Sequence, residues 1–134
     1  MRPCLLFVVL STTHWCTTFS GSLASELSIV DVGAVEDGKT VNTKAIQSAI
    51  DKIAAEGGGR VAIPQGVFVS GAVFLKPKVN LHLEDGAVLR CSTDMKHFPG
   101  QRTRIEGHFE ESFNPALINA DGCDGLRITG KGTL

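Results

Sequence analysis

The second half of this sequence is a succession of short apolar runs, and that pattern limits the folds open to the chain more than any other feature. Seven runs of three to five residues recur after Gly57, separated by segments rich in glycine, proline, asparagine and aspartate. They span residues 60–63, 67–69, 72–75, 79–83, 87–90, 116–118 and 126–129. Strand candidates this short and this close together are typical of hairpins, of a β-sandwich or of a coil of stacked turns.

A single amphipathic helix is predicted before these runs. Apolar residues recur at i, i+3, i+4, i+7 and i+8, at Ile46, Ala49, Ile50, Ile53 and Ala54. This spacing places them on one helix face. Asn42 is expected to be the N-cap, because its side-chain oxygen can accept from the amides of the first turn. Gly57 can take the left-handed position that ends a helix, so the predicted helix spans residues 43–56.

Two observations favour the coil over the hairpin alternatives. The sequence contains no Asn-Gly pair, a strong short-range hairpin signal, and the one helix precedes the strands instead of alternating with them. A coil of stacked turns leaves an open apolar end, which a helix lying across it would cover. Residues 27–32 alternate and are expected to form a strand, 33–41 a polar loop, and 94–114 the longest segment without a strand.

Residues 1–24 have the features of an export signal. Arg2 gives a positive start, residues 5–10 form an apolar run too short to span a bilayer, and Ser22 and Ala24 put small residues at the cleavage positions. Cleavage after Ala24 would leave a secreted or periplasmic part, residues 25–134, with no further membrane segment. The alternative is an N-terminal anchor that is never removed.

Charge and cysteine content exclude several partners. The chain has 13 basic and 14 acidic residues, a formal net charge of −1, which gives no reason to expect nucleic acid or an anionic membrane surface as a partner. Two cysteines, Cys91 and Cys123, remain after the signal. They could pair in an oxidising compartment or stay as free thiols. No metal-ligand spacing such as C-x-x-C is present, so no metal site is predicted.

Several motifs resemble those of a known family. Residues 31–34, 37–38, 42–51 and 57–66 are similar to the opening of the pectate-lyase superfamily. The following stretches resemble glycoside hydrolase family 28, the polygalacturonase-like enzymes: Gly71–Lys76, Val79–Leu89, Thr103–Gly107 and Pro115–Ala120. The match runs from about residue 28 to the end, where residues 130–134 are similar to a turn that this family usually continues with Asp-Gly.

The resemblance implies an all-β fold, a right-handed parallel β-helix with an N-terminal capping α-helix, here truncated. It implies inverting hydrolysis of galacturonan or rhamnogalacturonan chains by a monomeric enzyme without a cofactor. In this family, aspartates, a histidine and an Arg-x-Lys motif on later turns carry out the reaction. None of these motifs occurs here, so no catalytic residue is assigned, and the 134-residue chain alone is expected to be inactive and prone to aggregate.

Two other functions remain open on the same scaffold. A polysaccharide lyase would need calcium or a strong base to remove the proton next to the uronate carboxyl group. A non-catalytic β-helix could bind glycans or act as an adhesin. The fold alone does not decide among the three, and the family motifs favour the hydrolase.

Few residues of this chain are candidates for binding or chemistry. Glu84 and Asp85 are adjacent acids, but Gly86 follows, and the pattern favours a turn over a catalytic pair. Arg102 and Arg104 lie in the long segment without a predicted strand and are the candidates for contact with a substrate carboxylate. The competing interpretation is that they are ordinary solvated loop charges.

Two further patterns favour structural roles. Gly125, Gly130 and Lys131 have the spacing of a phosphate-binding loop, but Gly132 stands where Ser or Thr would be needed and no helix follows. His82 alternates with two leucines, so it is expected to face outward from a turn, without partners for a metal.

Overall fold

A computed structural model describes residues 25–105 and 107–134, so the predicted export signal lies outside the described residues. Its elements begin with β1 (Ser25–Ser28), the 3-10 helix η1 (Ile29–Val32), β2 (Asp37–Val41) and α1 (Thr43–Ala55). They continue with β3 (Gly59–Ile63), β4 (Gly66–Ser70), β5 (Val73–Phe74), β6 (Val79–Leu83), β7 (Ala87–Cys91) and η2 (Met95–His97). The last are β8 (Gln101–Ile105), β9 (His108–Phe113), β10 (Ile118–Asn119) and β11 (Arg127–Gly130).

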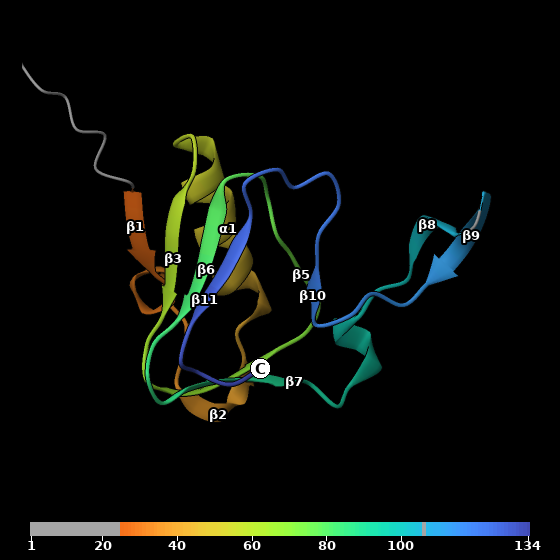
Figure 1. Ribbon diagram of the computed structural model, residues 1–134. Coiled ribbons are helices and arrows are strands. Elements are labelled where there is room, and N and C mark those ends of the chain that lie inside the picture. Colours follow the sequence, from red (N-terminus) through yellow and green to blue (C-terminus); the bar gives the residue numbers. More distant parts are fainter. Residues whose placement is uncertain (1–24, 106) are drawn as a thin grey trace, which may run out of the picture.

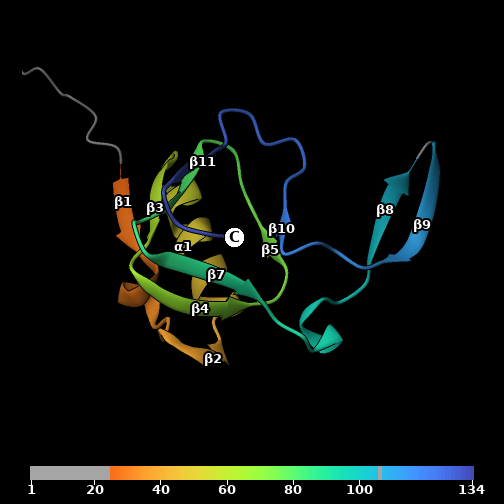
Figure 2. The ribbon, with the colours of Figure 1, turned by 60° about the horizontal axis from the view of Figure 1, so that its bottom comes forward.

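The strands stack into three parallel walls, as expected for a coil. The first wall has the order β1-β3-β6-β11 and the second β2-β4-β7, while β5 and β10 form the third. Every pair within these walls is parallel. Consecutive strands belong to different walls, and strands of one wall lie side by side (Figure 1; Figure 2 shows β2, β4 and β7 lying one above another). The predicted parallel β-helix is confirmed.

Helix α1 forms the third side of the first turn. It follows β2 and precedes β3, and so takes the place that β5 occupies in the next turn. Its apolar face is buried at Ile46, Ala49, Ile50 and Ile53. Its end also follows the prediction: Gly57 has φ +96°, and the N–H groups of Gly57 and Gly58 donate to the carbonyls of Ala54 and Ile53 at 3.1 and 3.0 Å. This double hydrogen bond is the Schellman motif.

The predicted role of Asn42 as a side-chain cap is wrong. Asn42 is 3% exposed, and its Oδ1 accepts from the Val35 N–H at 2.7 Å instead of from the first turn of α1. Its Nδ2 donates to the carbonyls of Val35 and Thr40, each at 2.9 Å. The amide therefore closes the loop before the helix by bonding three of its backbone groups.

Three other local predictions need correction. Residues 27–32 are a strand only as far as Ser28, after which η1 places Ile29 in the core. The loop predicted at 33–41 contains β2, whose pairing with β4 holds a polar sequence in an extended form. The segment 94–114 contains η2 and an antiparallel hairpin of β8 and β9, which stands away from the coil in both views (Figures 1 and 2).

The core fills the space between the three walls and α1. Phe68, Ile50, Leu81 and Leu89 are among the side chains that are buried there almost completely. Each such side chain stabilises the fold by about 1.5–3 kcal/mol relative to its exposed state. No helix in the described part of the chain is long and apolar enough to cross a membrane.

Candidate functional site

A cleft of about 640 Å³ lies between the third wall and the hairpin, and we call it the hairpin cleft. The wall contributes Phe74 from β5, the following Leu75, and Ile118 and Asn119 from β10. The hairpin contributes Gln101, Arg102 and Phe113. One side is therefore largely apolar, and the other carries a cation and an aromatic ring. Sugar rings present both apolar C–H faces and polar edges, so such a surface suits them.

The predicted candidate Arg102 lies in this cleft. Its guanidinium carbon is 4.0 Å from the centroid of the Phe109 ring on β9, a cation–π contact that orients the charge. The ring of Phe113, 48% exposed, lines the same cleft. The second candidate, Arg104, belongs to β8 and pairs with Phe109 through the backbone register, but its side chain lies outside the described set.

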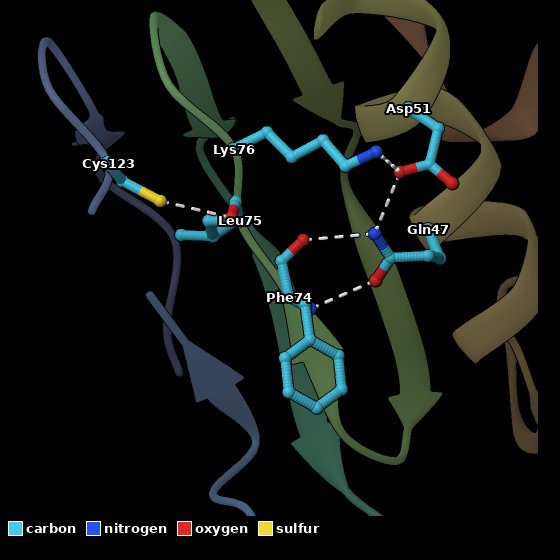
Figure 3. A network of polar contacts seen from close by, with 6 residues as sticks. All are labelled: Gln47, Asp51, Phe74, Leu75, Lys76 and Cys123. Atoms are coloured by element: carbon cyan, nitrogen blue, oxygen red, sulfur yellow. Dashed lines mark hydrogen bonds and ion pairs between the residues drawn. The ribbon is translucent and has the colours of Figure 1, made fainter. Parts of the chain in front are cut away.

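The floor of the cleft is held in place from α1, and Figure 3 shows the network. The Gln47 side-chain amide accepts from the Phe74 N–H and donates to the Phe74 carbonyl, both at 2.9 Å. These are the two bonds that a neighbouring strand would make with β5. A single side chain therefore supplies the missing strand pairing where a helix replaces a strand.

A second contact joins α1 to the end of β5. Lys76 Nζ lies 2.8 Å from Asp51 Oδ1, and the Gln47 amide also donates to that carboxylate at 3.1 Å. Partial burial works to raise the pKa of Asp51, but the hydrogen bonds and charge of Lys76 and the bond from Gln47 outweigh it, and the pKa lies below its ordinary value. Both partners are about half exposed, so this ion pair stabilises the fold by no more than about 1 kcal/mol.

Two side chains from the next turn complete the support. The Cys123 thiol donates to the Leu75 carbonyl at 3.1 Å (Figure 3). Asn119 Oδ1 accepts from the Ala116 N–H at 2.9 Å, and its Nδ2 donates to the carbonyls of Ala116 and Val73 at 2.7 and 3.2 Å. The side-chain polar groups of Asn119 are thus hydrogen-bonded to the backbone of the coil, although the residue lines the cleft.

The described lining of this cleft is suited to binding. Among the lining residues that the structure describes, Asp121 is the single carboxylate, whereas glycoside hydrolysis by inversion uses two carboxyl groups about 6.5–9.5 Å apart. Within residues 25–105 and 107–134 no group of three or more His, Cys, Asp or Glu residues is arranged to hold a metal ion. The cleft can orient a sugar chain and counter its carboxylates with Arg102.

The other singled-out residues have structural positions. Glu84 and Asp85 lie in a turn closed by the Ala87 N–H bond to the Glu84 carbonyl at 3.0 Å, with Gly86 at φ +78°. The turn prediction is confirmed. Cys91 and Cys123 are separate free thiols, Cys91 exposed and Cys123 half-buried.

His82 also lies where the sequence predicts. It is half-buried on the outer face of β6, between two buried leucines, and its Nδ1 is 2.8 Å from Thr129 Oγ1 on the next turn. The outward orientation is confirmed, and the hydrogen bond links neighbouring turns of the first wall.

Sequence reasoning did not identify Gln47, Asp51 and Phe113 as parts of this site. Gln47 and Asp51 lie four residues apart, which places them together on one side of α1. That spacing was a usable signal for a polar helix edge, but the strand it serves is distant in sequence. Phe113 lies in a segment for which no strand was predicted.

Comparison with known proteins gives sequence relatives of one kind over most of the chain. An exo-poly-alpha-D-galacturonosidase of Dickeya chrysanthemi is 34% identical over 126 residues, which are 88% of this chain and 20% of that enzyme. A Vitis vinifera protein named "Probable polygalacturonase" is 38% identical over 79 residues, 57% of this chain and 16% of the relative. The chain spans a fifth or less of the length of these relatives. No protein-family profile matches it.

Solved structures agree with the sequence relatives. A hyperthermoactive exopolygalacturonase from Thermotoga maritima has a TM-score of 0.71 and 32% identity, covering 81% of this chain and 24% of that one. A family 28 exopolygalacturonase of Yersinia enterocolitica has a TM-score of 0.70 and 37% identity, covering 80% of this chain and 20% of that one.

The walls and the helix that completes the first turn define the class of this chain, a parallel β-helix. Within that class, the relatives and the solved structures confirm the resemblance to glycoside hydrolase family 28, and the chain is polygalacturonase-like.

Shorter matches reach proteins with other names. "Alginate lyase 7" of Azotobacter vinelandii is 51% identical over 47 residues, 34% of this chain and 6% of that protein. "Plasmin and fibronectin-binding protein A" of Streptococcus pneumoniae is 41% identical over 75 residues, 54% of this chain and 10% of that protein. Parts of this sequence thus have similar counterparts in proteins named for different activities.

Proposed function

We propose that this chain is the N-terminal part of an exported glycoside hydrolase that cleaves pectic chains, galacturonan or rhamnogalacturonan, by inverting acid/base hydrolysis. The observation that carries the proposal is the 34% identity over 126 residues to an exo-poly-alpha-D-galacturonosidase. In this proposal the catalytic carboxylates belong to later turns of the coil, and the first turns supply the scaffold and one side of the substrate path.

The hairpin cleft supports a role in substrate contact. A polyuronate carries a carboxylate on every sugar, and an arginine can meet a carboxylate with two parallel hydrogen bonds. Arg102 lies beside the exposed ring of Phe113, against which the apolar face of a sugar can pack. We propose that Arg102 contacts a uronate of the bound chain, with Arg104 as the second candidate on the same strand.

Product analysis tests this function. The complete reading frame that carries this sequence should be expressed, and the product, here called the full-length protein, incubated with polygalacturonate. New reducing ends without ultraviolet-absorbing unsaturated sugars are expected. Proton NMR of the first-formed product, before mutarotation, should show the anomeric configuration opposite to that of the cleaved bond. Unsaturated products would identify a lyase and refute the hydrolase.

The short match to a protein named as an alginate lyase makes the lyase the second candidate. A lyase of this kind needs a cation or strong base near the uronate, so its activity should disappear with a calcium chelator. Binding without either product would favour the third alternative, a glycan-binding or adhesive β-helix, for which the streptococcal match is the supporting observation.

A further inference from the structure

A second cleft, of about 440 Å³, lies on the outer face of the second wall, and we call it the outer cleft. Val41, Val69 and Arg90 are register partners across β2, β4 and β7, so they form one row on that face. Val69 is 7% exposed and lies at the base of the row, next to the half-buried Val41. The floor of the outer cleft is therefore apolar.

Two cations flank this floor. The Arg90 side chain reaches back across β4, and its Nη2 donates to the Gly38 carbonyl, which places the guanidinium beside Lys39. The partner of Arg90 is a neutral carbonyl, so its positive charge is not cancelled by that bond. Neither Lys39 nor Arg90 forms an ion pair with any other residue in the part of the chain that the structure describes.

Two acidic side chains that lie within two residues of the outer-cleft lining in the sequence are engaged with backbone amides. Asp37 accepts from the N–H groups of Lys39 and Thr40 at 2.9 and 2.7 Å, and from the Thr40 hydroxyl at 2.7 Å. Asp94 accepts from the Lys96 N–H at 2.9 Å. These carboxylates serve turns, which leaves the cations of the outer cleft available to an external anion.

Hydroxyl and imidazole groups form the remaining rim. Ser92 Oγ lies 2.7 Å from His97 Nδ1 and accepts from the Asp94 N–H at 3.2 Å, which fixes both side chains. Thr93 is exposed and lines the same cleft. The outer cleft thus combines two cations, an apolar floor and a rim of hydroxyl groups.

We propose that the outer cleft is a second binding site for a uronate sugar, separate from the hairpin cleft. The cations would meet the carboxylate, the rim would bond the ring hydroxyls, and Val41 and Val69 would pack against the apolar face of the ring. This inference rests on the proposed function, because a polyuronate chain is the ligand that supplies such sugars. A second contact on the same chain would raise its local concentration at the enzyme.

Cys91 is exposed and is one of the residues that line the outer cleft, so a ligand bound there is expected to limit access to its thiol. The full-length protein should be treated with an alkylating reagent in the presence of increasing galacturonate, and modification of Cys91 followed by mass spectrometry of its peptide. Galacturonate is expected to slow modification of Cys91, whereas galactose, which lacks the carboxylate, is not. The rate of Cys91 with galactose is the reference, and Cys123, whose half-buried thiol is bonded to Leu75 at the hairpin cleft, reports separately on that cleft.

Substitutions in the outer cleft test whether its cations cause the protection of Cys91 by galacturonate. Lys39→Gln is expected to raise the half-protecting galacturonate concentration about 1.4- to fivefold, the range for loss of one exposed charge contact. Lys44→Gln, which removes an exposed lysine on α1, should leave it unchanged. Thr93→Ala offers a second, exposed substitution on the rim, with a smaller expected shift.

Three results would overturn the assignment: no protection by galacturonate, equal protection by galactose, or equal protection by inorganic phosphate, which would mark a general anion cleft. Hydrolysis of polygalacturonate is measured on the same preparation. Hydrolysis without protection of Cys91 refutes only the outer cleft, and protection without hydrolysis refutes only the proposed function.

Discussion

Removal of the Gln47 amide should loosen the junction between α1 and β5 more than any other single polar change on the helix. Gln47→Ala deletes two hydrogen bonds of 2.9 Å to the backbone of Phe74, which is half-buried. Each such bond contributes about 0.5–1.5 kcal/mol net. Alanine is the better helix former by only a few tenths of a kcal/mol, so the expected loss of stability is about 1–3 kcal/mol.

Amide hydrogen exchange at single-residue resolution provides the assay. The Phe74 N–H donates to Gln47, whereas its neighbours Val73 and Leu75 donate to carbonyls of the next turn, at Leu117 and Asn119. In Gln47→Ala, protection of the Phe74 amide should fall about five- to 150-fold, the equivalent of 1–3 kcal/mol. Protection of the neighbouring amides should fall less, because their partners remain.

Gln47→Glu separates the two bonds. A carboxylate can still accept from the Phe74 N–H but cannot donate to its carbonyl, and it would lie next to the carboxylate of Asp51. Protection at Phe74 should therefore exceed that of the alanine variant, while the melting temperature should still fall. Lys44→Ala, on an exposed position of α1, is the control. Equal protection of Phe74 in the native chain and in Gln47→Ala would refute the view that this side chain replaces a strand.

Three other changes test the site and the turns. Arg102→Gln should raise the KM for polygalacturonate about three- to tenfold with little change in kcat, and Arg102→Lys should recover part of the loss; an unchanged KM would remove Arg102 from the substrate path. Hydrogen bonds from the backbone and side chain of Thr40 and from the backbone of Lys39 lower the pKa of the Asp37 carboxyl from 3.8 to about 2. This carboxyl should therefore titrate near pH 2 when followed by NMR. Because the folded pKa is depressed, its stabilising effect is present above pH 3.8 and is lost as the pH falls toward 2; a midpoint near 4 would contradict this turn. In Gly130→Ala the new Cβ would lie 1.8 Å from the Leu83 carbonyl oxygen, and the residue would have to keep φ at +114°. The free energy of unfolding, measured by thermal denaturation, should therefore fall by at least about 2 kcal/mol. Gly33→Ala, at a position with positive φ but no atom within 4 Å, should lower it less.

The elements that were predicted correctly are those whose local sequence pattern is sufficient to identify them. The run at 79–83 alternates apolar and polar residues, and β6 has the same bounds with burial that alternates in step. The end of α1 was equally predictable, since the glycine at 57 is needed for a left-handed residue there. In these elements the local pattern and the tertiary fold agree.

The elements that the sequence missed depend on distant partners. Strand β2 has the polar sequence DGKTV and is extended because β4 pairs with it. The hairpin has no apolar runs of the kind that mark the coil, and its tight turn shows only in Gly107, at φ +93°, between the paired residues Ile105 and His108. Asn42 has the right residue type for a cap, but the buried loop beside it competes for the same oxygen. Propensity alone cannot decide such a competition.

The position of the hairpin allows one side of the hairpin cleft to change while the parallel walls stay in register. The chain leaves the coil after β7 and returns at β10, yet β5 and β10 remain in register, with Val73 and Leu75 bonded to Leu117 and Asn119 across the insertion. The pairing of β5 with β10 is therefore kept across the insertion, and the start of the inserted segment also supports the wall, through the buried Phe98 and the bond from the Ala72 N–H to the His97 carbonyl at 3.0 Å. Because the hairpin contributes Arg102 and Phe113 to the cleft while the wall contributes a clamped floor, changes in the hairpin alter the binding surface without altering the stacking of the turns. Binding specificity on this scaffold should thus vary with the insertions at its corners, and a graft of this hairpin into a related coil should transfer uronate affinity without a change in melting temperature.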